Sequence, residues 1–434
     1  MSKKPQDKGL TELAWERLFA KYEILKRIEG NGKFQISAAQ IKEFREPRLM
    51  AKFDHTVNLP KIFAENDLAI LPITRGDYVI SHFDAYHRFE PDVAEITRAS
   101  LPTYVQSLDC NNVLSETVAL NCAVAAGIVT EFLEDEAILS TVSGRMGSGN
   151  FTFTISNTSQ KTANRIEVHN SQIEIDAAFE GISSLSLFEA KRDLSEDFLV
   201  RQLYYPFRVW KSRVTKPVRP IFLVYSNGIY RLYEYCFEEP TNYSSLMLLK
   251  QKNYSIEDTE LTIADIQSVL YTTATDPAEP AIAFPQADSF ERVINLCELL
   301  SEQEMSRGKV TEEYAFNVRQ TNYYTDAGRY LGLLGKTVKE GSPHYKLTDK
   351  GKQILQMHFK QRQLAFCKLI LSHQVFHLTL EQYFKSGVMP SKNQIVLIMK
   401  QSNLYNVHSD VTFERRSSTI RGWVNWIVEL ANEE

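Results

Sequence analysis

The chain has 434 residues, a net charge of −5, 43% hydrophobic and 24% charged residues. One hydrophobic core rarely organises so long a chain, so we expect about two to four domains. The composition is that of an ordinary globular protein and excludes a disordered or collagen-like chain. The five cysteines are scattered without CxxC spacing, which argues against a disulfide framework and a cysteine zinc site. The polar N-terminus and the short apolar runs predict a cytoplasmic protein without a membrane span.

Residues 1–105 are predicted to form an N-terminal α+β domain that could contact DNA. Residues 37–53 have a helical pattern with Ser37 as N-cap and a break at Pro47, and two strand patterns follow around a turn at Gly76. Basic side chains of this region could contact phosphates or simply solvate a helix surface; they are Arg45, Arg48, Lys52 and Arg75.

Residues 106–271 are predicted to form a compact α/β domain. A long helical pattern covers residues 114–135, and a second helix is expected over residues 195–211. Strand patterns surround the second helix, and Asn227-Gly228 predicts a hairpin turn. The predicted strands are 137–144, 150–156, 172–179, 184–191, 220–226 and 229–237.

The C-terminal part is predicted to hold a winged-helix DNA-binding domain. Residues 272–289 contain three prolines and no hydrophobic period, as is typical of a linker. Residues 290–358 then show three helical patterns followed by a hairpin signal, which is the order of a winged helix. Residues 359–434 are expected to be helical, with the option of a second winged-helix unit.

Three side chains of the predicted α/β domain form the candidate catalytic centre. The strand period of two places Glu189 and Lys191 on one face, and Asp176 ends an apolar strand upstream. Two carboxylates brought together repel each other unless a divalent cation lies between them, and hard oxygen ligands suit Mg²⁺. The cation would polarise a phosphate, and Lys191 would orient water or stabilise the developing charge. Taken alone, the Glu189 and Lys191 pair could equally be a salt bridge.

The surrounding segments add a family resemblance. Residues 173–180 (IEIDAAFE) and 185–210 (LSLFEAKRDLSEDFLVRQLYYPFRVW) resemble the active-site region of type II restriction endonucleases of the PD-(D/E)xK nuclease superfamily, over about residues 112–240. Residues 44–55 and 71–83 resemble the N-terminal region of the same enzymes. The chain departs from many relatives in having Ile175 in place of a proline.

That resemblance implies particular roles. Asp176 and Glu189 would be metal ligands for Mg²⁺, Lys191 the catalytic lysine, and Gln202 a glutamine that serves the site from the following helix. An additional acid from the helix before the sheet would be either Glu116 or Glu131, and the sequence does not choose between them.

The candidate DNA-reading residues lie in the C-terminal part. In a winged helix the third helix enters the major groove and the wing contacts the backbone. Arg suits guanine, and Gln or Asn suits adenine. The residues at the start of the third helix are Arg319, Gln320, Asn322, Tyr323 and Tyr324, and those of the wing are Lys336, Lys339, His344 and Lys346. Residues 413–427 resemble the last helix of a second winged helix, in which Arg415 and Arg416 could reach DNA while Trp423 and Trp426 are core.

The sequence therefore predicts a sequence-specific, Mg²⁺-dependent type II restriction endonuclease acting on double-stranded DNA. The basic run over residues 191–219, with eight Lys and Arg against three acids, fits that partner. A homodimer and a cognate DNA methyltransferase that acts on the same site are further expected partners, and no membrane is involved. The alternatives are a repair or methylation-dependent nuclease, and a non-catalytic winged-helix regulator; the winged helix could also serve protein contact only.

Overall fold

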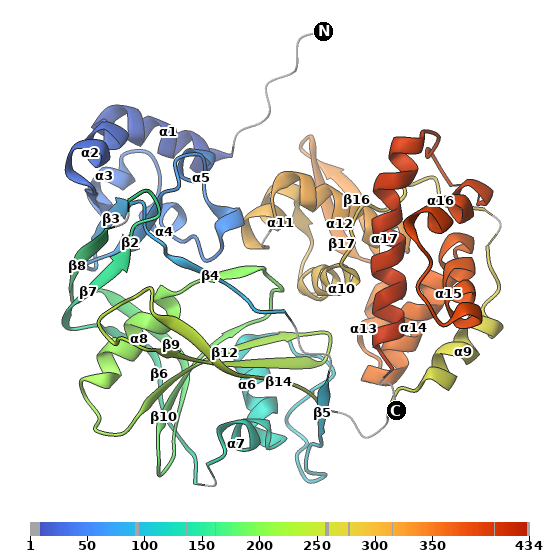
Figure 1. Ribbon diagram of the computed structural model, residues 1–434, viewed down its shortest axis with the longest axis horizontal. Helices are drawn as coiled ribbons and strands as arrows, with labels where there is room; N and C mark the ends of the chain where they lie inside the picture. Colours follow the sequence, from blue (N-terminus) through green and yellow to red (C-terminus); the bar gives the residue numbers. More distant parts are fainter. Residues whose placement is uncertain are drawn as a thin grey trace.

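The computed structural model describes residues 9–91, 95–135, 137–160, 162–256, 260–276, 278–314, 316–402 and 404–431. It is a mixed α/β multidomain protein built around a central mixed sheet (Figure 1). Within these ranges, no helix is long and apolar enough to cross a membrane. The polar N-terminal segment, residues 1–8, lies outside the described residues.

The N-terminal unit packs short helices against a three-stranded sheet of order β1-β3-β2. Trp15, Phe19 and Phe63 meet edge to face in its core. Ser37 caps a helix in a capping box with Gln40, as the sequence predicts. Its elements are α1 (Leu10–Tyr22), α2 (Ile24–Asn31), β1 (Phe34–Ser37), α3 (Ala38–Lys42), α4 (Pro47–Met50), η1 (Thr56–Asn58), α5 (Lys61–Ala64), β2 (Ala69–Pro72) and β3 (Asp77–Ser81).

This unit ends earlier than the predicted boundary at residue 105. Strand β4 (Tyr86–Arg88) pairs with β11 (Asp197–Leu199), and β5 (Ile96–Ala99) lies parallel to β14 (Leu246–Ile256). Because the backbone hydrogen bonds of β4 and β5 are made with the central domain, both strands belong to it.

The central sheet has seven strands in the order β5-β14-β13-β12-β10-β9-β6. The pairs β10–β12 and β14–β5 are parallel and the other pairs are antiparallel. Side chains of β10 alternate between two cores, with Leu187 on the α8 side and Phe188 on the α6 and α7 side. The remaining elements are α6 (Glu116–Ala125), α7 (Ile128–Leu133), β6 (Leu139–Gly147), β7 (Asn150–Ser156), β8 (Ala163–His169), β9 (Gln172–Glu180), β10 (Leu185–Lys191), α8 (Arg201–Lys211), β12 (Val218–Ser226) and β13 (Ile229–Phe237).

Two glycines set the local geometry of this domain. Gly127 has φ +75° and divides the predicted long helix over 114–135 into α6 and α7. Asn227 and Gly228, with φ 54° and 77°, make the turn between β12 and β13 that the sequence predicts. A Cβ on Gly228 would lie 2.6 Å from Nη2 of Arg362, so the turn is pressed against the C-terminal domain.

The predicted linker is not a free connection. Helix α9 (Ile263–Thr272) packs into the same core as α14 (Phe359–Leu371). The described residues of the segment 273–288 form no helix, yet Phe284 and Ala287 are fully buried in that core. Prolines interrupt regular structure here, but the apolar side chains still pack into the C-terminal core. This segment therefore belongs to the C-terminal domain, and the predicted boundary at residue 272 is too late.

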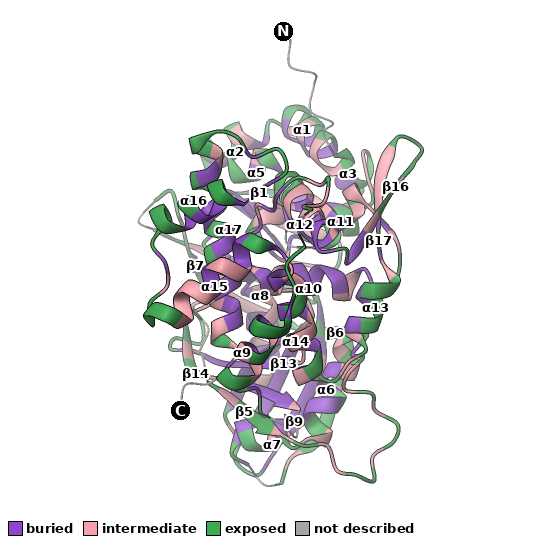
Figure 2. Ribbon diagram, turned by 90° about the vertical axis from the view of Figure 1, so that its right-hand side faces the viewer, coloured by how far each residue is buried: buried purple, intermediate pink, exposed green. Residues whose placement is uncertain are grey.

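The first half of the C-terminal domain has the predicted order of three helices and a hairpin. It consists of α10 (Phe290–Leu299), β15 (Met305–Ser306), α11 (Arg307–Glu313), α12 (Val318–Tyr330), β16 (Leu334–Lys339), β17 (Ser342–Leu347) and α13 (Asp349–Leu355). The hairpin of β16 and β17 extends from the body with an exposed tip (Figure 2). Its small sheet has the order β15-β17-β16.

The second half does not form a second winged helix. It contains α14, α15 (Gln374–Ser386), α16 (Lys392–Gln401) and α17 (Asp410–Glu429), and the described residues of 359–431 contain no hairpin that could serve as a wing. Helix α17 instead inserts its apolar side into the domain core, with Trp423 fully buried and Trp426 nearly so, as the sequence predicts for both tryptophans. The indole of Trp423 donates a hydrogen bond to the Ala287 carbonyl at 2.7 Å.

Candidate active site

The candidate site lies where β9 and β10 separate. Their pairing runs from Leu185 opposite Glu180 to Phe188 opposite Ala177. On its other edge β9 contains one residue more than β6 at this point, which is a β-bulge. The Asp176 carboxylate lies at the bulge and its Oδ2 accepts a hydrogen bond from the Ala190 N–H at 2.8 Å. The bulge therefore turns Asp176 toward β10.

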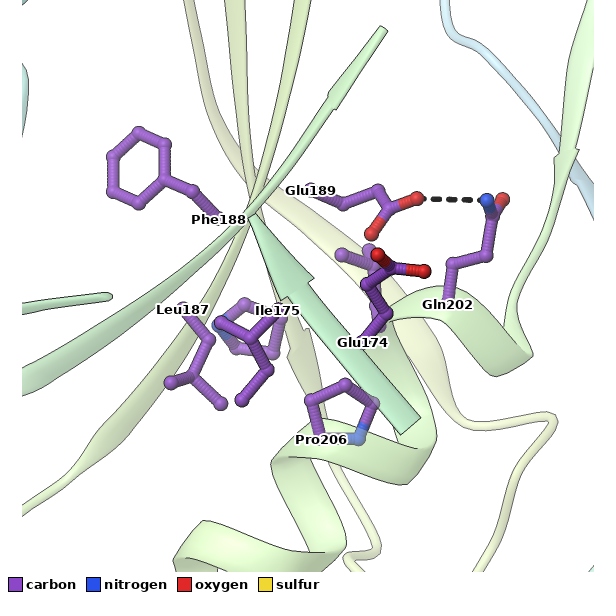
Figure 3. Close-up of a pocket in the computed structure, with 9 residues that line it drawn as sticks. Glu174, Ile175, Leu187, Phe188, Glu189, Gln202 and Pro206 are labelled. Atoms are coloured by element: carbon purple, nitrogen blue, oxygen red, sulfur yellow. Dashed lines mark hydrogen bonds between the residues drawn. The ribbon is translucent and has the colours of Figure 1, made fainter. Parts of the chain in front are cut away.

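Glu189, Lys191 and Gln202 meet on the side of the sheet that α8 covers. The Lys191 ammonium donates to Oε1 of Glu189 and, at 3.3 Å, to the Ala190 carbonyl. Gln202, in the first turn of α8, donates from Nε2 to the same Glu189 oxygen at 2.7 Å (Figure 3). The structure thus brings together all four residues that the sequence proposes for catalysis.

An apolar pocket floor supports this group. Ile175, Leu187 and Pro206 lie beneath the Glu189 side chain (Figure 3). Pro206 stands inside α8, and together with these aliphatic side chains it keeps water away from one side of the carboxylate. Glu189 is consequently only 8% exposed.

The electrostatics of the site are dominated by burial. Burial raises the pKa of Glu189 to about 7, although the Lys191 charge works against this and the Asp176 charge adds to it. Burial alone would lower the pKa of Lys191, but the charges of Glu189 and Glu116 outweigh it and the net pKa is raised. Lys191 is therefore a fixed positive charge at neutral pH.

Of the two helix acids left open by the sequence, Glu116 belongs to the site. It is the first residue of α6, after the N-cap Ser115. Burial raises its pKa, the Lys191 charge lowers it and the Asp176 charge raises it further, which indicates that its carboxyl lies near the same centre. Glu131 instead accepts hydrogen bonds from Lys252 at 2.8 Å and from the Tyr254 hydroxyl, both on β14.

Two further acids were not expected. Glu174 points toward Glu189 and Gln202 (Figure 3), and its Oε1 accepts a hydrogen bond from Arg145 at 3.1 Å. Asp54 comes from the N-terminal unit, and its charge acts on both Glu189 and Lys191. The strand alternation of β9, in which 174 and 176 are two apart, could have indicated Glu174.

Asp54 is held at the site by contacts between the two domains. Its carbonyl accepts a hydrogen bond from the Leu199 N–H at 2.9 Å. The neighbouring His55 ring lies 3.0 Å from the Asp193 carboxylate through Nε2. No sequence pattern distinguishes Asp54 from an ordinary surface acid, because its place depends on this tertiary contact.

The donor set suits a hard cation held by few protein ligands. Among the described residues no group of three or more His, Cys, Asp or Glu side chains is arranged to hold a metal ion. Asp176 and Glu189 supply two carboxylates, and Oε1 of Gln202 is buried without a hydrogen-bond partner. Mg²⁺ is commonly bound through one or two carboxylates, with waters and substrate phosphates completing its shell. The residues present fit that mode.

The predicted DNA-reading residues lie at the start of α12. Arg319 is exposed and its Nε donates to the Tyr323 hydroxyl at 2.6 Å. Gln320 uses its Oε1 to cap the helix at the Asn317 N–H, at 3.0 Å. Asn322 is half-buried. Arg319, Gln320, Asn322 and Tyr323 therefore share one stretch of partly open helix surface.

Tyr324 does not belong with them. It is 4% exposed and its ring stacks on Phe316 with centroids 4.6 Å apart. The helical period turns this residue into the core, so its prediction as a base contact is wrong.

The predicted basic residues of α17 lie beside α12. Burial and the adjacent Arg415 lower the pKa of Arg416, and the charges of Tyr323 and Asp326 on α12 also act on it. Arg415 is exposed. On the hairpin, Lys336 and Lys346 are exposed, whereas Lys339 pairs with Glu304 at 2.5 Å. In the N-terminal unit Arg48, Lys52 and Arg75 are exposed and Arg45 is half-buried.

Comparison with known proteins divides the chain into three parts. Three family models match it, and each is described as a domain of unknown function: DUF6996 over residues 12–80, DUF6997 over residues 81–255 and DUF7226 over residues 292–432. All residues of the candidate active site except Asp54 lie in the second match. No curated protein and no solved structure matches the chain.

Proposed function

We propose that the chain is a Mg²⁺-dependent type II restriction endonuclease of the PD-(D/E)xK superfamily that hydrolyses phosphodiester bonds of double-stranded DNA. The observation that carries the proposal is the meeting of Asp176, Glu189 and Lys191, with Gln202 bonded to Glu189, at the bulge where two central strands part. A structural salt bridge would need only Glu189 and Lys191. The further carboxylates of Asp176 and Glu116 make the group costly without a cation.

Each residue has a chemical task in this proposal. Asp176 and Glu189 hold the cation, which when bound would polarise the scissile phosphate and favour hydroxide formation from water. Lys191 keeps a positive charge where negative charge develops on the phosphate. Gln202 fixes the orientation of Glu189. Hydrolysis then forms a bond from the water oxygen to phosphorus and breaks the bond from phosphorus to the leaving sugar oxygen.

The C-terminal domain supports DNA as the substrate. Its order of α10, α11, α12 and the β16–β17 hairpin is that of a winged helix, in which α12 would enter the major groove and Lys346 would contact the backbone. Arg415 and Arg416, next to α12, extend the basic surface. As further proposals, a homodimer would present one active site to each DNA strand, and a cognate methyltransferase would modify the same site.

The test is a digest of plasmid DNA of known sequence with Mg²⁺, followed by mapping of the ends. We expect cleavage at a defined sequence, and Asp176→Asn and Lys191→Ala should each lower the cleavage rate by roughly 100-fold or more. Glu180→Gln is the matched control, because Glu180 lies on β9 but pairs with Lys216 at 2.9 Å away from the site.

Three outcomes would contradict this assignment. Uncut plasmid together with binding to a discrete DNA site would indicate a non-catalytic winged-helix regulator. Cleavage of methylated or damaged DNA alone would indicate a repair or methylation-dependent nuclease. Parental rates in both variants, with the fold verified, would make the group a structural ion-pair cluster.

A further inference from the structure

A second polar cavity lies between the central and C-terminal domains, apart from the carboxylate pocket of Figure 3. Its volume is about 480 Å³. One wall comes from residues 111–114 and Tyr225 of the central domain, and the other from α13, α14 and the end of α10. Pockets that hold small ligands commonly measure about 300–1,000 Å³.

Arg362 is the unusual residue of this cavity. It is 3% exposed, and among the described residues no carboxylate lies within ion-pair distance of its guanidinium. Its Nε has no hydrogen-bond partner, and Nη1 makes only a long contact of 3.4 Å to the Leu355 carbonyl. An arginine stays charged in proteins, so a buried guanidinium without a directly paired carboxylate is energetically unfavourable.

The carboxylates that line the cavity are already engaged by other groups. Glu302 pairs with Arg192 at 2.6 Å. Glu298 accepts hydrogen bonds from the Ser226 hydroxyl at 2.8 Å and the Asn227 N–H at 2.9 Å. Arg362 is therefore the cavity cation without a paired carboxylate among the described residues. Lys352 is largely exposed, and its pair with the almost fully exposed Asp349 is long, at 3.9 Å, so its ammonium can also meet an anion from outside the chain.

We propose that this cavity binds a nucleoside monophosphate group, with its phosphate on Arg362 and Lys352. Guanidinium and ammonium groups are the usual partners of phosphate oxygens. The apolar side chains of Val113, Tyr225 and Leu355 offer a surface for a base, and nearby amides, those of Asn111, Asn112 and Gln356, can bond its polar edge. Inorganic phosphate alone would leave this apolar side of the cavity empty.

The inference goes beyond the proposed nuclease activity and does not depend on it. Two sources share the required chemistry: a free mononucleotide, and the terminal nucleotide of a DNA strand. Either occupant would contact the segments that flank the candidate active site, because Arg192 follows Lys191 and Leu114 precedes the N-cap of α6.

Isothermal titration calorimetry on the full chain, without Mg²⁺, tests the proposal. The probes are the four deoxynucleoside monophosphates, a 5′-phosphorylated trinucleotide, thymidine and inorganic phosphate. We expect at least one phosphorylated nucleoside probe to bind. Thymidine and inorganic phosphate should bind with an affinity at least roughly tenfold lower than that probe. The trinucleotide compared with the mononucleotides identifies the source.

Three variants assign the binding to this cavity. Lys352→Ala changes an exposed residue that tolerates truncation, and Arg362→Lys keeps the charge but loses the planar fork; each should weaken binding by roughly tenfold. Lys368→Ala, an exposed lysine on the same helix α14 as Arg362, is the control and should bind as the parent does. The proposal fails if no phosphorylated probe binds, if inorganic phosphate binds as tightly as the best nucleotide, or if both cavity variants bind with parental affinity.

Discussion

Gln202 is the residue through which α8 acts on the candidate site, because its amide holds one oxygen of Glu189. Gln202→Met preserves length and apolar packing but removes this hydrogen bond. If Gln202 is a positioning residue, kcat should fall roughly tenfold while DNA affinity and the unfolding midpoint stay near parental values. Steady-state cleavage kinetics with a parallel DNA-binding assay provide the measurement. Gln172→Met, an exposed position on β9, is the control.

The pair of His55 and Asp193 predicts a pH dependence of stability. Burial lowers the pKa of His55, but the hydrogen bond and charge of Asp193 outweigh it, so the net pKa lies above the usual 6.5. Burial raises the pKa of Asp193, and the same pair brings it below the usual 3.8. The contribution of His55 is therefore complete below pH 6.5 and is lost as pH rises through its folded pKa. That of Asp193 is present above pH 3.8 and is lost on acidification.

We accordingly expect His55→Gln to destabilise the protein by about 1–3 kcal/mol at about pH 5.5 and by less at about pH 9. Urea unfolding at both pH values measures the difference. His169→Gln changes a histidine that is 60% exposed and should show little effect at either pH. An equal loss at both pH values would mean that His55 contributes packing and not charge.

At the scale of single residues, strand alternation and the nearby apolar residues are sufficient to predict that Asp176, Glu189 and Lys191 lie close together, which the structure shows; their catalytic roles stay a prediction. The sequence does not predict the place of Asp54, which depends on two contacts between domains: the hydrogen bond from Leu199 to the Asp54 carbonyl, and the contact of His55 with Asp193. The prediction of Tyr324 as a base contact is wrong because the helical phase of α12 turns this ring into the core.

Helix α10 acts on the candidate site through Asn295, which is fully buried. Its Oδ1 accepts from the Leu194 N–H at 2.9 Å and the Tyr314 hydroxyl at 2.6 Å, and its Nδ2 donates to the Arg192 carbonyl at 2.7 Å. Asn295→Leu would remove these bonds in a closed interior and leave the Tyr314 hydroxyl only its long contact of 3.4 Å to the Arg292 carbonyl. We expect a loss of about 2–3 kcal/mol in unfolding free energy and slower cleavage, since residues 192–194 directly follow Lys191.

Tyr314→Phe is the graded comparison for Asn295. It removes the hydroxyl, with its bond to Asn295 and its long contact of 3.4 Å to the Arg292 carbonyl, and should cost about 1 kcal/mol with cleavage unchanged. Denaturant midpoints and cleavage rates of the two variants, measured together, separate loss of stability from displacement of the segment after Lys191. If both variants lost the same stability and retained parental cleavage, α10 would be merely a packing neighbour.

Elements with strong local patterns were predictable, and those defined by distant partners were not. The apolar runs of β9, β10, β12 and β13 were evident in the sequence. Strand β14 is not evident in the sequence because polarity does not follow burial along it: Met247 and Leu249 are exposed, whereas Asn253 and Ser255 are buried. Strand β5 is a short edge strand that pairs with β14. The Pro-rich segment after α9 resembles a linker in the sequence because its buried residues, such as Phe284, are isolated and show no regular hydrophobic spacing.

At the scale of the whole molecule, the domains share polar interfaces that are closed to solvent. Asn227 and Gln363 exchange two amide hydrogen bonds, at 2.9 and 3.0 Å, across the boundary between the central and C-terminal domains. The β12–β13 turn that carries Asn227 would be uncovered by cutting the chain near residue 280. The domains are therefore best tested in the full chain by surface substitutions and not by truncation.

The basic surface of the C-terminal domain predicts how the affinity for DNA depends on salt concentration. If Arg319, Lys346 and Arg415 each neutralise one phosphate, the slope of log affinity against log salt should become shallower by about one for each alanine substitution. Fluorescence anisotropy with a labelled duplex at several salt concentrations measures the slopes, using Ca²⁺ in place of Mg²⁺ to limit cleavage. Lys26→Ala, a lysine 77% exposed on α2 of the N-terminal unit, is the control. Parental slopes in all three variants would show that DNA, if bound, contacts another face of the molecule.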